Sequence, residues 1–257
     1  MTEPTRDFSF ECDGARLHAW ETGAGRPLLF VHGGLADHRA ALFHVGRAAT
    51  SLRVITPDLR GAGRSVWSGA LGWDRFAGDL RALLDHLAVE RAIVGGTSMG
   101  AGVALRFALR HPDRLSGLVL ASPLYPGADR GLPEAARVAM RFMDVAGQRT
   151  LTDGIDALRP LFAALPEPVR SVALEMTAGF DPASGAATTR FLATDAQPLD
   201  RVEELGAIDV PVLIVPGTDP QHPAEVAELY AKHVRRPVVR PAGADLAEEV
   251  VRFAAGL

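Results

Sequence analysis

The sequence predicts an α/β protein in which helices cover both faces of one mostly parallel sheet. Three observations support this prediction. Short segments that are apolar on both faces, such as residues 27–33 and 210–217, are typical of parallel strands buried under helices. Amphipathic stretches with helical periodicity alternate with these segments, as they do in doubly wound folds. The 257 residues are 47% hydrophobic, which is enough for one large core.

The expected strands begin with a hairpin. Its two arms, residues 8–13 and 15–22, meet at Asp13-Gly14, a strong hairpin signal. Six further strands are expected at residues 27–33, 53–58, 91–98, 115–122, 210–217 and 237–241. The sheet should therefore have about eight strands.

Helical stretches lie between these strands. Four core helices are expected, at residues 73–89, 99–111, 223–234 and 244–257. The first places Phe76, Leu80 and Leu84 on one face, which would pack against the sheet. The second should end before Pro112, because proline disfavours the helical conformation in the residue that precedes it.

Residues 123–209 interrupt this alternation. Their helical stretches are residues 133–147, 151–165, 167–179 and 185–195, with no clear strand among them. The segment is far longer than an ordinary connection between two strands. We therefore expect a helical cap, inserted between the sixth and seventh strands of a core domain formed by residues 1–122 and 210–257.

The clearest chemical signal is Gly96-Thr97-Ser98-Met99-Gly100. It follows an expected buried strand and opens an expected helix, the context in which such a motif forms a sharp nucleophile turn. The turn would place the Ser98 hydroxyl at the carboxyl end of the sheet, where open α/β sheets bind ligands. The amino end of the following helix would favour a developing negative charge there.

Two more motifs complete a family resemblance. His32-Gly33-Gly34 ends the third expected strand, and residues 58–65 read D-L-R-G-A-G-R-S after the next strand. With Ser98, these motifs make the chain similar to the capped α/β-hydrolases, a family that includes esterases, lactonases and haloperoxidase-like enzymes. The resemblance implies an oxyanion hole formed by the backbone N–H groups of Gly34 and Met99. It also implies a serine hydrolase. No metal or organic cofactor is expected, because the sequence contains no HExxH, P-loop or complete GxGxxG motif.

The same resemblance places a catalytic acid after the seventh strand. Asp219 lies in the expected turn and is followed four residues later by Pro223, as in the family. Such a carboxylate orients a histidine and stabilises its protonated form. The triad order in this fold then calls for a histidine after the eighth strand.

That histidine is absent from its usual place. Residues 242–245 read A-G-A-D, and no histidine follows His233. Three alternatives remain open: His222, three residues after Asp219, serves as the base; Asp245 serves as a weak base; or the base is lost. A chain without a base would be an impaired small-molecule-binding protein or a lyase-type enzyme on the same scaffold.

The expected substrate is a small, apolar, uncharged ester, lactone or similar acyl compound that forms an acyl-enzyme at Ser98. It would bind between core and cap. The candidate lining residues are Leu35, Trp67, Tyr125, Phe142, Phe162 and Phe180.

Composition bears on partners and location. The net charge of −4 gives no electrostatic case for nucleic acid or an anionic membrane as a partner. No apolar run approaches the length of a membrane span, and the start lacks a signal-peptide pattern, so a cytoplasmic protein is expected. Cys12 is the only cysteine, and a single lysine with no asparagine is typical of a GC-rich bacterial genome. The oligomeric state is left open.

Overall fold

The computed structural model describes residues 5–165, 167 and 169–257. Eight strands form one sheet in the order β1-β2-β4-β3-β5-β6-β7-β8. The strands are β1 (Arg6–Cys12), β2 (Ala15–Thr22), β3 (Pro27–Val31), β4 (Arg53–Pro57), β5 (Ala92–Thr97), β6 (Leu115–Ala121), β7 (Val212–Val215) and β8 (Pro237–Val239). Strand β2 runs antiparallel to both β1 and β4, and the remaining pairs are parallel. The predicted fold class is confirmed.

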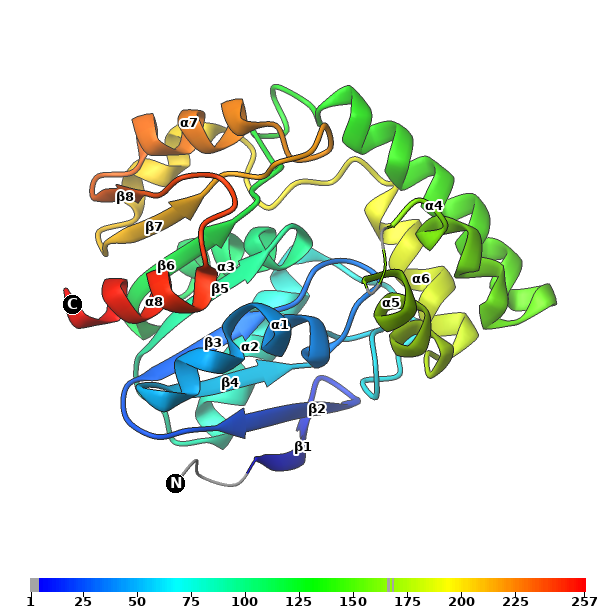
Figure 1. The fold of residues 1–257 in the computed structure, drawn as a ribbon, viewed down its shortest axis with the longest axis horizontal. Helices are drawn as coiled ribbons and strands as arrows, with labels where there is room; N and C mark the ends of the chain where they lie inside the picture. The colour runs from blue at the N-terminus through cyan, green and yellow to red at the C-terminus, as the bar shows by residue number, and fades with distance from the viewer. Residues whose placement is uncertain (1–4, 166, 168) are drawn as a thin grey trace.

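Helices cover both faces of this sheet (Figure 1). Helices α1 (His38–Val45) and α8 (Leu246–Ala255) pack on one face, and α2 (Trp73–His86), α3 (Met99–Arg110) and α7 (Ala224–His233) pack on the other. Strand β3 shows why both faces are apolar. Its Leu29 and Val31 belong to one buried cluster, and its Leu28 and Phe30 belong to the other. Helix α1 has no counterpart among the expected helices.

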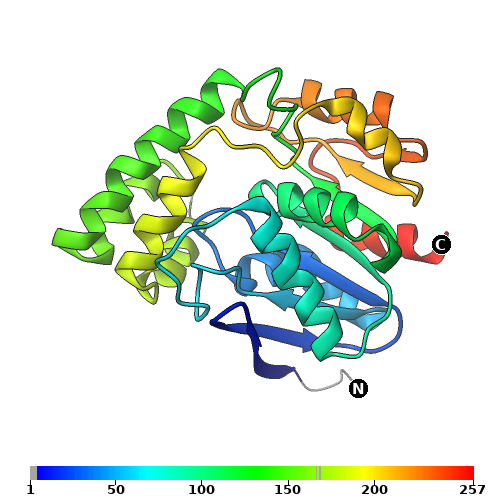
Figure 2. The same cartoon turned by 180° about the vertical axis from the view of Figure 1, so that it is seen from behind.

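In the described part of the segment 123–209, three α-helices lie between β6 and β7: α4 (Glu134–Asp153), α5 (Val169–Ala178) and α6 (Pro182–Leu192). They lie together beside the carboxyl ends of the parallel strands (Figures 1 and 2). The end of the segment behaves differently. The short 3₁₀ helix η4 (Val202–Ala207) packs against α3 and α7, so this part belongs to the core and not to the layer of cap helices.

The turn at residues 58–65 is held by a buried ion pair. The Arg60 guanidinium donates to both carboxylate oxygens of Asp79 on α2, at 3.0 and 2.6 Å, and also to the Cys12 carbonyl at 2.8 Å. The Arg60 side chain is fully enclosed. This motif therefore fastens the turn to the first hairpin and to α2. In the described residues, no helix is long and apolar enough to cross a bilayer.

Candidate active site

Ser98 lies at a sharp turn between β5 and α3. Its φ of 54° is in the left-handed region, which residues other than glycine rarely adopt. Two glycines allow the chain to turn this tightly. A Cβ on Gly96 would lie 2.4 Å from the Gly100 carbonyl oxygen, and a Cβ on Gly100 would lie 2.4 Å from the Val31 carbonyl oxygen. The motif therefore forms the strained elbow that the sequence predicts.

His222 lies directly across from this serine. Its Nε2 is 2.8 Å from the Ser98 Oγ, and its Nδ1 is 3.0 and 2.9 Å from the two carboxylate oxygens of Asp219. The carboxylate can only accept, so Nδ1 carries the proton and Nε2 is free to accept from the Ser98 hydroxyl. Of the three alternatives for the base, the structure brings His222 to the serine.

The turn after β7 holds Asp219 and His222 in one conformation. The Asp219 carboxylate accepts hydrogen bonds from the backbone N–H groups of Gln221 and His222, at 2.8 and 3.2 Å. Gly217 lets the chain fold back on itself, because a Cβ there would lie 2.3 Å from the His222 Cβ. The acid and the facing imidazole are therefore positioned by six consecutive residues.

The electrostatics of this pair follow from its partial exposure. The His222 side chain is 17% exposed and that of Asp219 is 49% exposed. Partial burial acts to raise the pKa of Asp219, but the imidazole of His222 and the two backbone N–H groups outweigh it and hold the pKa below its usual value. Asp219 is therefore ionised at neutral pH and can stabilise a positive charge on His222.

A hollow of about 210 Å³, here called the Ser98 hollow, opens above the serine. The core contributes Gly33, Gly34, Ser98, Met99, Leu124, Tyr125, Gln221 and His222, and α4 and α6 contribute Ala136, Met140, Met143 and Leu192. Gly34 and Met99, the expected oxyanion donors, thus lie beside the serine. The Leu192 Cδ1 lies 3.0 Å from the place a Cβ on Gly34 would take, so a side chain there would require Leu192 to shift.

Five of the six residues expected to line the pocket are absent from the lining of this hollow, and only Tyr125 is present. Phe142 points to solvent with 58% of its surface exposed. The Trp67 ring lies 4.6 Å beneath the Arg60 guanidinium. These predictions were wrong because an aromatic residue in a sequence does not show which way its helix or loop is rotated.

The other three residues lie in small apolar clusters between the loop after β3 and the segment 123–209. Leu35 and Phe162 belong to one small apolar cluster beneath α4, and Phe180 packs against Ala36 and Met176 in another. The side chains that reach the hollow from this segment include Met140, Met143 and Leu192, which were not among the residues expected to line the pocket. The spacing of Met140 and Met143, three residues apart on a helix, was the available signal.

The remaining titratable candidates have structural roles. Asp245 caps the amino end of α8 and pairs with Arg47 on the surface, away from the Ser98 hollow. The buried His32 accepts from the Leu59 N–H through Nε2 at 3.0 Å and reaches the Gly33 carbonyl through Nδ1 at 2.7 Å. It therefore holds the loop that carries Gly34, and burial lowers its pKa.

One group near the site resembles a metal-binding set. Asp37, His38 and Asp58 offer ligand atoms within 4.8 Å of one another. Each of them already has partners within the protein: Asp37 pairs with Arg39, Asp58 accepts from the backbone N–H groups of His38 and Arg64, and the His38 Nδ1 lies 3.0 Å from the Asp58 Oδ1. We therefore assign these residues to the architecture of the loop.

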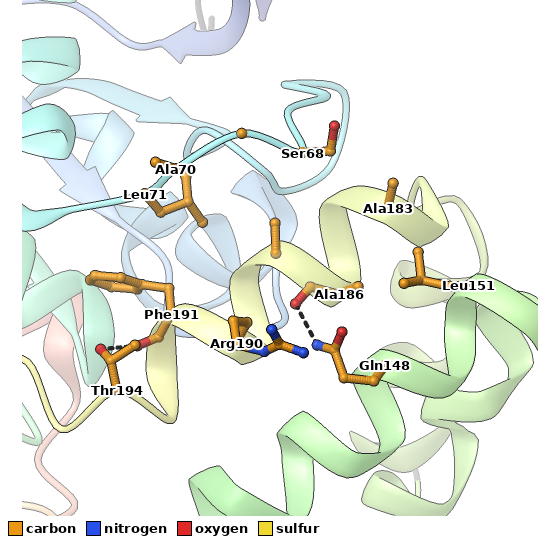
Figure 3. A pocket seen from close by; sticks show the side chains of 12 residues that line it. Ser68, Ala70, Leu71, Gln148, Leu151, Ala183, Ala186, Arg190, Phe191 and Thr194 are labelled. Atoms are coloured by element: carbon orange, nitrogen blue, oxygen red, sulfur yellow. Dashed lines mark hydrogen bonds between the residues drawn. The ribbon is translucent and has the colours of Figure 1, made fainter.

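A hollow larger than the Ser98 hollow lies elsewhere (Figure 3). This α4–α6 groove, about 450 Å³, is formed by residues 68–71 with residues of α4 and α6, among them Gln148, Arg190 and Phe191. It shares no lining residue with the Ser98 hollow, and its lining contains no histidine or carboxylate. Figure 3 shows the Gln148 amide donating to the Ala186 carbonyl, at 3.0 Å, which joins α4 to α6. The groove therefore lacks the chemistry found at Ser98.

Comparison with known proteins agrees with this geometry. A family model described as "alpha/beta hydrolase fold" matches residues 26–247. The chain is 34% identical over 126 residues to the AB hydrolase superfamily protein YisY of Bacillus subtilis. This match covers 45% of this chain and 47% of that protein. The chain is 36% identical over 112 residues to 2-hydroxymuconate semialdehyde hydrolase of a Pseudomonas species, covering 42% and 40%. The match thus spans less than half of each relative.

Among solved structures, the chain is similar over its whole length to a thermophilic esterase from Thermogutta terrifontis. The TM-score is 0.77 at 26% sequence identity, and the match covers 98% of this chain and 97% of the other.

Proposed function

We propose, from the premise that this chain belongs to the α/β-hydrolase fold family, that it hydrolyses small esters, lactones or related acyl compounds through an acyl-enzyme at Ser98. One observation carries the proposal. The continuous hydrogen-bonded chain from the Ser98 hydroxyl through His222 to Asp219 is the arrangement that activates a serine for attack on a carbonyl carbon.

In the first step His222 takes the hydroxyl proton through Nε2 while the Ser98 Oγ attacks the carbonyl carbon of the substrate. The imidazole becomes positively charged, and Asp219 stabilises that charge through Nδ1–H. A histidine in this position is well suited to the task, because a neutral imidazole accepts a proton at one ring nitrogen while it donates one from the other.

The negative charge that develops on the carbonyl oxygen needs donors in place beforehand. We assign this role to the backbone N–H groups of Gly34 and Met99, which lie beside Ser98 in the same hollow. The amino end of α3, which begins at Met99, adds its positive dipole. Losing one such donor typically costs about 3–4 kcal/mol of transition-state stabilisation.

Collapse of the tetrahedral species completes the cycle. His222 returns its proton through Nε2 to the departing alkoxide, which leaves an acyl group on Ser98. A water molecule then attacks this ester while His222 removes its proton. His222 returns that proton to the Ser98 Oγ as the second tetrahedral species collapses, which releases the acid product and restores the serine.

The hollow also limits the substrate. Its walls are mainly apolar, with Met140, Met143 and Leu192 supplied by the cap, and its volume of about 210 Å³ suits a small acyl group. No arginine or lysine lines it, which favours an uncharged substrate. The proposed substrates are therefore small.

A fluorophosphonate probe tests the proposal, since it reacts only with an activated serine. We expect labelling of Ser98 that Ser98→Ala abolishes. His222→Ala should lower kcat/KM on p-nitrophenyl acetate by about 10⁴–10⁶-fold. The double variant should be no worse than either single one, because the two residues act as a unit. The matched control is His86→Ala, a surface histidine of α2 outside the hollow.

The alternatives give different results. A chain that is not labelled but binds an apolar ligand tightly is a binding protein. Product formed without incorporation of oxygen from labelled water indicates a lyase. Either outcome would overturn the hydrolase proposal.

A further inference from the structure

Helix α4 carries an apolar stripe on its outer face. Val138, Phe142 and Val145 are 56%, 58% and 64% exposed. They are spaced by four and three residues, so they lie on one side of the helix. Both views place α4 along the outer edge of the molecule (Figures 1 and 2). A contiguous exposed apolar surface of this kind usually marks an interaction site.

The opposite side of α4 packs against the rest of the protein, so the apolar stripe is not the side by which α4 contacts its own chain. Met140 and Ala136 are buried and line the Ser98 hollow. A Cβ on Gly147 would lie 1.9 Å from the Thr189 Oγ1 of α6, which shows how closely these two helices approach. The outer stripe is therefore presented on a fixed support.

The charges on this face are arranged symmetrically around the stripe. Glu134 lies one turn before Val138 and pairs with Arg137, and Arg149 lies one turn after Val145 and pairs with Asp153. Exposed pairs of this kind contribute little to stability, so both side chains can exchange these partners for those of a second copy. Arg141 and Phe142 are adjacent at the centre, and both are exposed. Consider a second α4 helix that runs antiparallel to the first, related to it by a two-fold axis midway between Arg141 and Phe142. Its Val145 lies opposite Val138, and its Arg149 lies opposite Glu134. The face is therefore complementary to itself.

We propose that this face binds the same face of a second copy of the chain, with the two α4 helices antiparallel around a two-fold axis midway between Arg141 and Phe142. Val138 would pack against Val145 of the second copy, Glu134 would pair with its Arg149, and Arg141 would lie over its Phe142 ring. A stable dimer typically buries about 800 Å² per partner. The contacts proposed here come from one helix per copy, so we expect the dimer to form at roughly micromolar concentration or above.

An anionic membrane fits this face less well than a second copy does. Helices that bind such membranes carry an excess of lysine and arginine on their polar side. Along α4, three arginines are balanced by three carboxylates, so the helix has no net side-chain charge to attract anionic lipid. Charge complementarity therefore favours the homodimer. The inference does not depend on the proposed reaction.

Sedimentation velocity on the full chain, from about 1 µM to about 500 µM, tests this inference. We expect the mass to rise with concentration from 27.3 kDa toward twice that value. Phe142→Asp should weaken association about tenfold or more, because it places a charge at the centre of the interface. The matched control is Phe43→Asp, which changes a phenylalanine that is 79% exposed on α1, and it should leave association unchanged.

A charge exchange tests the orientation. Glu134→Arg and Arg149→Glu should each weaken the dimer, and the double variant should restore it, because only the antiparallel arrangement brings these two positions together. A mass that stays at the monomer value throughout, a dimer that Phe142→Asp leaves intact, or a double variant that stays weak would overturn the proposal. So would binding to phosphatidylglycerol vesicles that Phe142→Asp abolishes without any dimer of the parent chain.

Discussion

Gly217→Ala should impair the site without replacing any residue of the proposed triad. The added Cβ would lie 2.3 Å from the His222 Cβ and 2.5 Å from the His222 carbonyl oxygen, whereas an ordinary contact begins at about 3.4 Å. His222 must therefore move by about 1.1 Å. A shift of that size along the 2.8 Å bond between Ser98 Oγ and His222 Nε2 takes it beyond hydrogen-bond length.

A misplacement of about 1 Å in a reacting group typically costs on the order of 10²-fold in rate. We therefore expect kcat/KM on p-nitrophenyl acetate to fall by about that factor, and fluorophosphonate labelling of Ser98 to slow in parallel. The loss of folding free energy should be limited to about 1–3 kcal/mol, the usual effect of overpacking. Circular dichroism and urea unfolding would show that the variant is folded.

Gly78→Ala is the matched control. Gly78 lies within α2, and a Cβ there meets no atom within 4 Å. Alanine favours a helix over glycine by up to about 1 kcal/mol, so this variant should be slightly more stable and fully active. A folded Gly217→Ala protein with the activity of the parent chain would refute the reasoning, because the turn would then not be what positions His222.

Three further predictions concern other charged groups. Asp219→Asn should lower kcat/KM by about 10²–10³-fold in a steady-state assay. This is less than the ~10⁴-fold loss typical of a buried triad aspartate, because water screens the charge of a side chain that is 49% exposed. A loss larger than about 10³-fold would contradict this reasoning. Burial lowers the pKa of His32 and of His44 below 6.5 in the folded protein. As the pH falls, these two histidines are therefore protonated at a higher pH in the unfolded chain than in the folded one. The free energy of unfolding should therefore fall as the pH drops below about 6.5, by at most ~1.4 kcal/mol per pH unit for each histidine, and urea titrations from about pH 8 to pH 5 that show no slope would exclude it. Arg60→Met leaves the buried Asp79 carboxylate without its partner and should cost about 3–5 kcal/mol in urea unfolding, with partial recovery in Arg60→Met/Asp79→Leu; a cost below ~1 kcal/mol would show that the pair is dispensable.

The fold could be predicted because its signals are local. Strand β7 (Val212–Val215) lies inside the expected segment 210–217, and α3 ends at Arg110, before Pro112, as expected. Helix α1 was not anticipated, although Asp37 caps it by accepting from the Arg39 N–H at 2.9 Å. A helix of eight residues shows little periodicity, so a single capping residue is a weak signal on its own.

The site was predictable where spacing alone decides the geometry. Asp219 and His222 are three residues apart in one turn, so their proximity needs no knowledge of the rest of the chain. The walls of the hollow were not predictable in this way. Leu192 reaches Gly34 from α6, which lies far from Gly34 along the chain. Phe142, an aromatic residue of the same cap, turns outward because α4 buries its other side.

The turn after β7 supplies both the carboxylate and the imidazole, and this has a consequence for the rest of the chain. Strand β8, helix α8 and the link between them hold none of the groups assigned to the reaction. Sequence changes in that region, including insertions or grafted segments in the link, are therefore free of chemical constraint as long as the strand and helix still pack. A displacement of this turn moves Asp219 and His222 together. The distance between the His222 Nε2 and the Ser98 Oγ therefore shows whether the three residues are in place.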